Sequence, residues 1–193
     1  MKTPLHYQLT ECDCGPTSLL NAISFLFERE EIPPEIVKTI MTYCLDCHGS
    51  DGTPGAYGTS HSAMMFLSSW FRRFGKAGRM AITSRYLSGQ DVSVDESSEI
   101  VKSLHQGGVA VVRLFDECPH YVLFTGEKDG KIYLFDPYYP CDDCPGDITV
   151  TLDHPFSYNH IVPFSYFNCD AEKLYSLRET KKREAILIFK TEV

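Results

Sequence analysis

Residues 8–27 read QLTECDCGPTSLLNAISFLF, and this stretch contributes most to what the sequence predicts about the fold. After Ser18 the apolar residues recur at helical spacing: Leu19, Ala22, Ile23 and Leu26, with Leu20 and Phe27 beside them. A helix that is apolar over so much of its circumference is typical of a buried element. We therefore expect a deeply buried helix over 18–27 that is entered through Cys14-Gly15-Pro16.

Cys14 stands at the entrance of this helix, which favours a reactive sulfur. The first N–H groups of a helix have no partner within it, and the helix dipole adds partial positive charge there. Both effects favour the thiolate, which is the nucleophilic form. Gln8 lies six residues earlier, and its amide can stabilise the oxyanion that forms when Cys14 attacks a carbonyl, together with the Cys14 backbone N–H. The alternative interpretation is an inert, buried Cys14 and a surface amide at Gln8.

Further helices are expected before the strands. The second begins near Pro34 and carries Ile36, Ile40 and Tyr43 on one face, and a loop covers 48–58. The third runs from Thr59 or Ser60 to Gly75 with a stripe of Ala63, Phe66, Leu67, Trp70 and Phe74. The fourth opens at the capping-box spacing of 93–96 and ends at Gly107-Gly108.

Short strands follow the helices. Ranges with strand character are 109–115, 120–125, 131–135, 148–152 and 185–189, and an Asp129-Gly130 turn signal separates the second from the third. Helices first and strands afterwards indicate an α+β fold with an antiparallel sheet.

The composition indicates one globular domain over 1–193. The chain has 193 residues, 43% of them hydrophobic, and 18 basic against 26 acidic side chains give a net charge of −8. The acidic balance argues against nucleic acid and against anionic membranes as partners. No apolar run approaches the ~18 residues of a membrane span, and the N-terminus carries no secretory core. We therefore expect a cytoplasmic protein whose eight cysteines are thiols, metal ligands or reactive groups.

The order of the motifs resembles that of the papain-like cysteine peptidases, most of all the bacteriocin-processing (double-glycine leader) peptidase domains and their stand-alone relatives. The matching features are a Gln six residues before the Cys of an acidic-Cys-Gly sequence, a strand that opens with His120, and the Asp136-Pro137 that ends the next strand. The agreement covers about residues 5–137. It implies a papain-like fold, with an N-terminal helical half packed on a C-terminal antiparallel sheet, and with insertions near 29–60 and 137–170.

The resemblance also implies roles for four residues. Cys14 would be the nucleophile, His120 the general base and acid, Asp136 the partner that orients His120, and Gln8 part of the oxyanion hole. His154 and His160 are competing bases, but neither has a strand and an Asp-Pro sequence as partner.

The hairpin between the two motifs can be tested by its pairing. With a loop over 126–130, His120 faces Asp136, and Val122 and Phe124 share one apolar face; with only Asp129-Gly130 in the loop, His120 faces Tyr139. Side-chain alternation favours the longer loop, in which directly opposed residues are close enough for the carboxylate to reach the imidazole.

Four other cysteines form two pairs with the spacing of zinc ligands. The pairs are Cys44 with Cys47 and Cys141 with Cys144, and Cys141 follows Cys47 by 94 positions in the chain. They form a candidate structural zinc site if they meet in space, and otherwise are independent thiols or a redox pair. Cys44 to His48 also matches the c-type haem signature, which the lack of an export signal disfavours. The predicted chemistry itself requires no cofactor.

The sequence therefore predicts a cysteine peptidase that cleaves a peptide or protein substrate through a thioester acyl-enzyme. One alternative is an acyltransferase or transglutaminase-like enzyme that uses the same residues and an amine acceptor. Another is a non-catalytic peptide-binding module, which the joint presence of Cys14, His120 and Asp136 disfavours. The cleavage sequence and the oligomeric state are not predicted.

Overall fold

The computed structural model describes residues 1–138 and 144–191. Its α-helices are α1 (Cys14–Leu26), α2 (Pro34–Tyr43), α3 (His61–Lys76) and α4 (Glu99–His105). Its strands are β1 (Ile82–Ser88), β2 (Val109–Asp116), β3 (Cys118–Lys128), β4 (Lys131–Phe135), β5 (Thr149–Val150), β6 (His160–Pro163) and β7 (Glu184–Lys190). Single 3₁₀ turns lie at Arg29–Glu31, Gly89–Asp91, Phe164–Tyr166 and Thr180–Lys182. The expected α+β class is confirmed, and β1 and β6 are strands that the sequence pattern does not predict.

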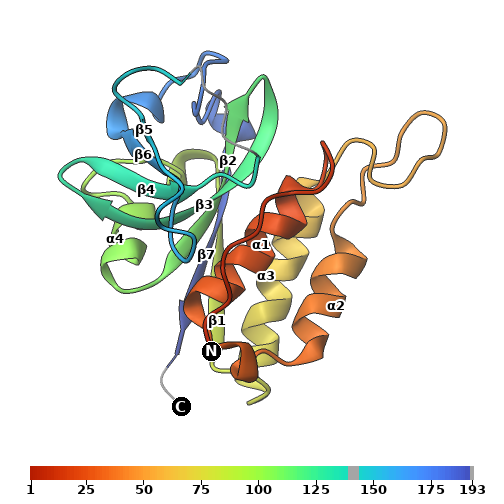
Figure 1. Cartoon of the computed structure of the whole chain (residues 1–193). Coiled ribbons are helices and arrows are strands. Elements are labelled where there is room, and N and C mark those ends of the chain that lie inside the picture. The colour runs from red at the N-terminus through yellow and green to blue at the C-terminus, as the bar shows by residue number, and fades with distance from the viewer. Residues whose placement is uncertain (139–143, 192–193) are drawn as a thin grey trace.

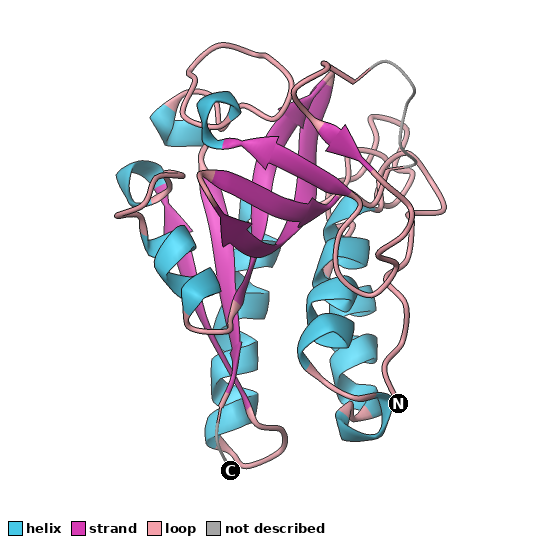
Figure 2. Ribbon diagram, turned by 60° about the vertical axis from the view of Figure 1, so that its left-hand side comes forward, coloured by secondary structure: helices cyan, strands magenta, loops and turns pink. Residues whose placement is uncertain are grey.

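The seven strands of the described residues form one antiparallel sheet with the order β1-β7-β2-β3-β4-β6-β5. The last strand, β7, pairs with both β1 and β2, so the C-terminal part of the chain lies inside the sheet. Figure 1 shows α1, α2 and α3 together on one side, and α4 against the other. The strong twist of the strands is visible in Figure 2. Within the described residues, no helix combines the length and the apolar character that crossing a bilayer requires.

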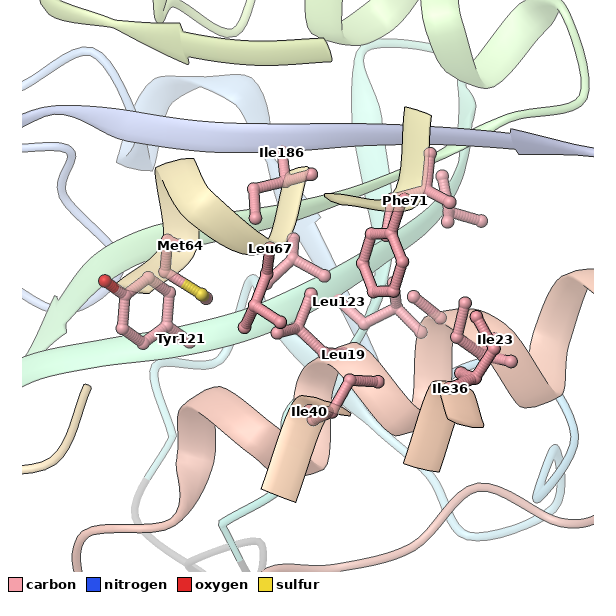
Figure 3. Close-up of a cluster of buried hydrophobic side chains, with 14 of the residues drawn as sticks. Leu19, Ile23, Ile36, Ile40, Met64, Leu67, Phe71, Tyr121, Leu123 and Ile186 are labelled. Carbon is pink, nitrogen blue, oxygen red and sulfur yellow. The ribbon is translucent and has the colours of Figure 1, made fainter. Parts of the chain in front are cut away.

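Alternate side chains of the central strands face two separate cores. Val109 and Val111 of β2 pack in the core with α1, α2 and α3, whereas Ala110 and Val112 pack in the core with α4. Burial on both faces explains why the first four residues of β2, Val109-Ala110-Val111-Val112, are all apolar rather than alternating. Figure 3 shows the helix-side core, in which side chains of all three helices converge on the sheet: Leu19, Ile23, Ile36, Ile40, Met64, Leu67 and Phe71 with Tyr121, Leu123 and Ile186.

The buried face of α3 differs from the predicted stripe. Ala63 and Leu67 are buried as expected, but Met64 and Phe71 are buried as well. Phe66 is 41% exposed and instead packs on Tyr43 of α2, with ring centroids 4.4 Å apart. The helix is thus rotated about its axis because it contacts both β1 and α2, which a single-face pattern does not anticipate.

The fourth helix begins later than the capping-box spacing predicts. Its N-cap is Ser98, whose hydroxyl accepts a hydrogen bond from the Val101 N–H. The carboxylate of Asp95 accepts hydrogen bonds from the N–H and hydroxyl of Ser97. Residues 93–97 therefore form a turn before the helix, and the predicted start at 93–96 is wrong.

The hairpin between β3 and β4 also differs from the predicted one. Its turn contains only Asp129 and Gly130, with φ of 54° and 72°, and Lys128 pairs with Lys131. Two consecutive positive φ values are typical of the type I′ turn that Asp-Gly favours. The predicted longer loop is wrong because this turn chemistry outweighs the alternation argument.

A β-bulge nevertheless leaves the side chains of β3 on the face of the sheet that the predicted register gives them. The register shifts between Phe124 and Gly126, so that Phe124 pairs with Leu134 rather than Ile132. The shift from the predicted register is two residues, and an even shift leaves every side chain on the same face of the sheet. If the register is extended by one residue, Val122 lies opposite Asp136 and His120 becomes a diagonal neighbour of that carboxylate.

Candidate active site

Cys14 is the first residue of α1 and is 7% exposed. The neighbouring Gly15 is required by a close approach, because a Cβ atom there would lie 2.4 Å from Oγ1 of Thr59. Thr59 directly precedes the N-cap of α3. The glycine thus allows the start of α1 to pack against the segment that leads into α3, rather than only leaving room beside the sulfur. Pro16 is tolerated in the first helical turn, where its missing N–H has no helical partner.

His120 lies between two other side chains. Its Nε2 is 2.7 Å from Oδ1 of Asp136, and the side chains are 7% and 4% exposed. The side chain of Cys14 interacts with His120 and contributes to the raised pKa of the imidazole. Because Asp136 occupies Nε2, Nδ1 is the ring nitrogen left for the sulfur. Diagonal cross-strand neighbours are about 7–8 Å apart, which a long polar side chain can span. This explains how the imidazole reaches the carboxylate without direct pairing.

The position of α1 above β3 brings the sulfur to the imidazole. The hydroxyl of Ser18, one turn into the helix, donates to the carbonyl of Tyr121 at 2.9 Å. Both Ser18 and Tyr121 are buried. Thus the helix start and the strand start meet, although more than one hundred residues separate them in the chain.

Asp136 is held by groups that sequence reasoning did not identify. Its Oδ2 accepts a hydrogen bond from the hydroxyl of Tyr175 (3.0 Å), and its Oδ1 also accepts one from the N–H of Tyr138 (2.9 Å). The side-chain amide of Asn159 pairs with the backbone of Asp136, at 2.7 Å to its N–H and 2.8 Å to its carbonyl. No local pattern marks Asn159 or Tyr175, since they follow Asp136 by 23 and 39 residues.

Electrostatics favour the charged form of both partners. Burial alone would lower the pKa of His120, but the Asp136 carboxylate and the Cys14 side chain raise it well above its usual value. Burial would likewise raise the pKa of Asp136, but His120 and further hydrogen bonds lower it. The geometry therefore supports an imidazolium beside an ionised carboxylate.

Gln8 lies next to this group but its side chain is engaged elsewhere. Its backbone N–H donates to the carbonyl of Pro137 at 2.8 Å, directly after Asp136. Its Nε2 donates to the carbonyl of Thr10 at 2.8 Å. One of the two N–H bonds of the amide is therefore used. The carbonyl oxygen of the amide is buried without a partner among the described residues.

The competing histidines have other contacts. His160 is buried, its Nδ1 lies 2.8 Å from Oδ1 of Asn159, and burial lowers its pKa. His154 stacks on Tyr158, with ring centroids 4.4 Å apart. Of the three predicted bases, His120 is the one whose pKa the Cys14 side chain raises.

Cys44 and Cys144, one from each cysteine pair predicted to hold zinc, lie on different sides of the sheet. Cys44 belongs to the helix-side core and Cys144 packs against the core around α4. Cys47 is partly exposed, and Cys141 lies outside the described residues. Among residues 1–138 and 144–191, no three His, Cys, Asp or Glu side chains are grouped to hold a metal ion. The zinc site stays a prediction.

Comparison with known proteins gives a weak likeness in structure. No family model and no curated protein matches the sequence. Among solved structures, the chain is similar to a crystal structure of a candidate C39-like peptidase from Bacillus anthracis. The identity is 15%, the TM-score is 0.47, and the match covers 98% of this chain and 96% of the other. Similarity at this level defines neither a function nor a site.

Proposed function

We propose that the protein is a cysteine peptidase with a papain-like arrangement, in which Cys14 is the nucleophile and His120 the general base. The observation that carries the proposal is the position of the His120 ring, which is hydrogen-bonded to Asp136 at 2.7 Å on the strand that the first turn of α1 contacts through Ser18 and Tyr121. A base that is oriented by a carboxylate and bonded to a nucleophile is the common arrangement of covalent hydrolases.

The proposed reaction begins from a thiolate–imidazolium pair, in which the proton of Cys14 has already passed to Nδ1 of His120. The thiolate attacks the carbonyl carbon of the substrate, and the carbonyl oxygen becomes an oxyanion. The C–N bond then breaks, and the imidazolium donates its proton to the departing amine. Water attacks the remaining thioester with His120 as base, which releases the acid and regenerates the thiol.

Two features support the charge distribution that these steps need. The raised pKa of His120 favours the imidazolium once Cys14 has lost its proton. The partial positive charge at the start of α1 favours the thiolate at Cys14. The second N–H of the Gln8 amide and the backbone N–H of Cys14 are the donors proposed for the oxyanion.

The test is the rate of iodoacetamide labelling as a function of pH. Cys14 should react at neutral pH as a thiolate, and the fast phase should disappear in Cys14→Ala. Mass spectrometry after treatment with a peptide chloromethyl ketone should locate the adduct on Cys14. Labelling of Cys14 at the rate of a free-thiol standard would contradict the proposal.

A further inference from the structure

The carboxylate of Asp13 points away from the helix that it precedes. An Asp at the N-cap usually accepts a hydrogen bond from an N–H of the first turn, which stabilises the helix. Asp13 is the N-cap of α1 but makes no such bond. Instead, Oδ1 accepts from the N–H (2.9 Å) and hydroxyl (3.1 Å) of Thr10, and Oδ2 accepts from the N–H of Leu9 (3.2 Å).

The segment that Asp13 holds is also the segment that holds Gln8. The carbonyl of Thr10 accepts the hydrogen bond from Nε2 of Gln8 at 2.8 Å. Since the amide group is planar, this bond and the backbone bond of Gln8 to Pro137 (2.8 Å) together set the direction of the second N–H. The Oε1 atom of Gln8 has no partner among the described residues, so it provides no alternative anchor there.

The same arrangement leaves the start of α1 uncapped by Asp13. The first N–H groups of a helix have no intrahelical partner, and that of Cys14 belongs to this group. A carboxylate turned toward these N–H groups would compete with an oxyanion for them. A carboxylate turned toward Leu9 and Thr10 does not compete, and its charge is satisfied by three donors.

We propose that Asp13 is a positioning residue of the oxyanion hole, which acts through Thr10 to direct the free N–H of Gln8 and leaves the Cys14 N–H available as the second donor. This inference rests on the proposed function, since it assigns a role within the same site. It predicts that Asp13 affects reactions that form an oxyanion and spares those that do not.

Two reagents separate these reactions at the same sulfur. With p-nitrophenyl acetate, the sulfur of Cys14 bonds to the acetyl carbon, p-nitrophenolate leaves, and the intermediate carries an oxyanion. With iodoacetamide, the sulfur bonds to carbon and iodide leaves, with no oxyanion. Both reactions need the thiolate, so the ratio of acylation to alkylation rates reports the oxyanion hole.

The experiment measures this ratio in full-length variants whose folding is checked by circular dichroism. Loss of one oxyanion donor typically lowers rates about 10²–10³-fold, and we expect Asp13→Ala, which acts indirectly, to lower the ratio about tenfold. Asp13→Asn keeps one acceptor oxygen for Thr10 and should give a smaller fall, of about threefold. The double variant with Gln8→Ala should be no worse than Gln8→Ala alone, because both changes affect one donor.

Asp51→Ala is the matched control. Asp51 accepts hydrogen bonds from the N–H (3.0 Å) and hydroxyl (2.8 Å) of Thr53, as Asp13 does from Thr10, but in an exposed loop. Its removal should leave the ratio unchanged. If Asp13→Ala does not fold, the threefold fall in Asp13→Asn is the deciding result.

An unchanged ratio in both Asp13 variants, with a reduced ratio in Gln8→Ala, would overturn the role of Asp13 and leave the proposed function intact. Additive effects of Asp13→Ala and Gln8→Ala would also overturn it, because Asp13 would then act independently of Gln8. Failure of the proposed function has a different signature, namely slow alkylation of Cys14 in the unmodified protein.

Discussion

Cys14 and Cys44 are buried to a similar extent, at 7% and 4% exposure, but they lie at opposite ends of their helices. Cys14 is the first residue of α1, whereas Cys44 is the C-cap of α2. The first position carries partial positive charge and the second partial negative charge. Burial raises the pKa of Cys44 to about 12, and the Thr59 hydroxyl only partly offsets this. Burial alone therefore makes a thiol inert, and a reactive one needs a favourable helix end and an imidazole.

Two histidine–carboxylate pairs also differ, namely in the group that the second ring nitrogen of each histidine faces. His61 binds Glu184 through Nδ1 (2.9 Å), but its Nε2 is engaged by Arg113 at 2.6 Å. His120 binds Asp136 through Nε2 and has its other side toward Cys14. An imidazole can act as a base only when one nitrogen is left for the proton donor. We therefore expect a structural role for His61, and the proposed catalytic role stays with His120.

The largest expected effect is the difference in activity between Cys14→Ala and Cys44→Ala. Cys14→Ala should lower hydrolysis of p-nitrophenyl acetate to the uncatalysed rate, a loss on the order of 10⁴-fold or more if the sulfur is the nucleophile. Cys44→Ala should keep activity within about threefold, while it lowers the free energy of unfolding by about 1 kcal/mol. The measurements are p-nitrophenolate release and urea unfolding. Equal losses of activity in the two variants would contradict the distinction.

The next effect concerns the carboxylate that orients His120. Asp136→Asn should reduce turnover by about 10²–10⁴-fold, because an amide nitrogen cannot accept the hydrogen bond from Nε2 and the wrong tautomer is favoured. The pH profile of alkylation at Cys14 should shift in the same variant. If turnover is unchanged in a folded Asp136→Asn protein, Asp136 does not orient the base.

A third effect is the pH dependence of stability. The raised pKa of His120 contributes stability that is complete below its unfolded value of about 6.5 and is lost as the pH rises through the folded pKa. The lowered pKa of Asp136 contributes stability that is present above about 3.8 and is lost as the pH falls through its folded pKa. The pair should therefore stabilise the protein most between about pH 4 and 6.5.

Urea unfolding of the wild type and of Asp136→Asn measures this contribution as a difference. We expect about 1–3 kcal/mol at pH 5 for a hydrogen bond between charged groups, and less at pH 9. Asp116, His160 and Tyr175 are other titratable groups that interact with Asp136, and they are present in both proteins and largely cancel. A difference that grows from pH 5 to pH 9 would show that the pair is not charged as described.

The smallest effect should be that of His61. His61→Gln should change turnover by less than about twofold and lower the free energy of unfolding by about 1 kcal/mol, the typical value of one hydrogen bond. Nitrophenolate release and urea unfolding again measure the two quantities. A loss of turnover comparable to that of Asp136→Asn would give His61 a part in the reaction.

Local sequence signals predict the structure correctly where the interactions that form it act between residues close in the chain. The apolar spacing after Ser18 predicts α1 because residues three and four apart share one helix face. The Asp129-Gly130 signal predicts a turn because both positions need positive φ. The predicted loop length is wrong because the Asp-Gly turn preference outweighs side-chain alternation, and the predicted register is wrong because a bulge lies between Phe124 and Gly126.

By itself, the sequence determined the α+β class, the buried helix that begins near Cys14, and the identity of His120 and Asp136 as candidates. Only the tertiary structure decided that β7 lies between β1 and β2, that Asn159 and Tyr175 hold Asp136, and that the Asp13 carboxylate faces away from α1. The physical reason is the range of the interactions. Helix periodicity and turn preferences act over a few residues, whereas strand order and the partners of a buried carboxylate are set by packing between distant segments.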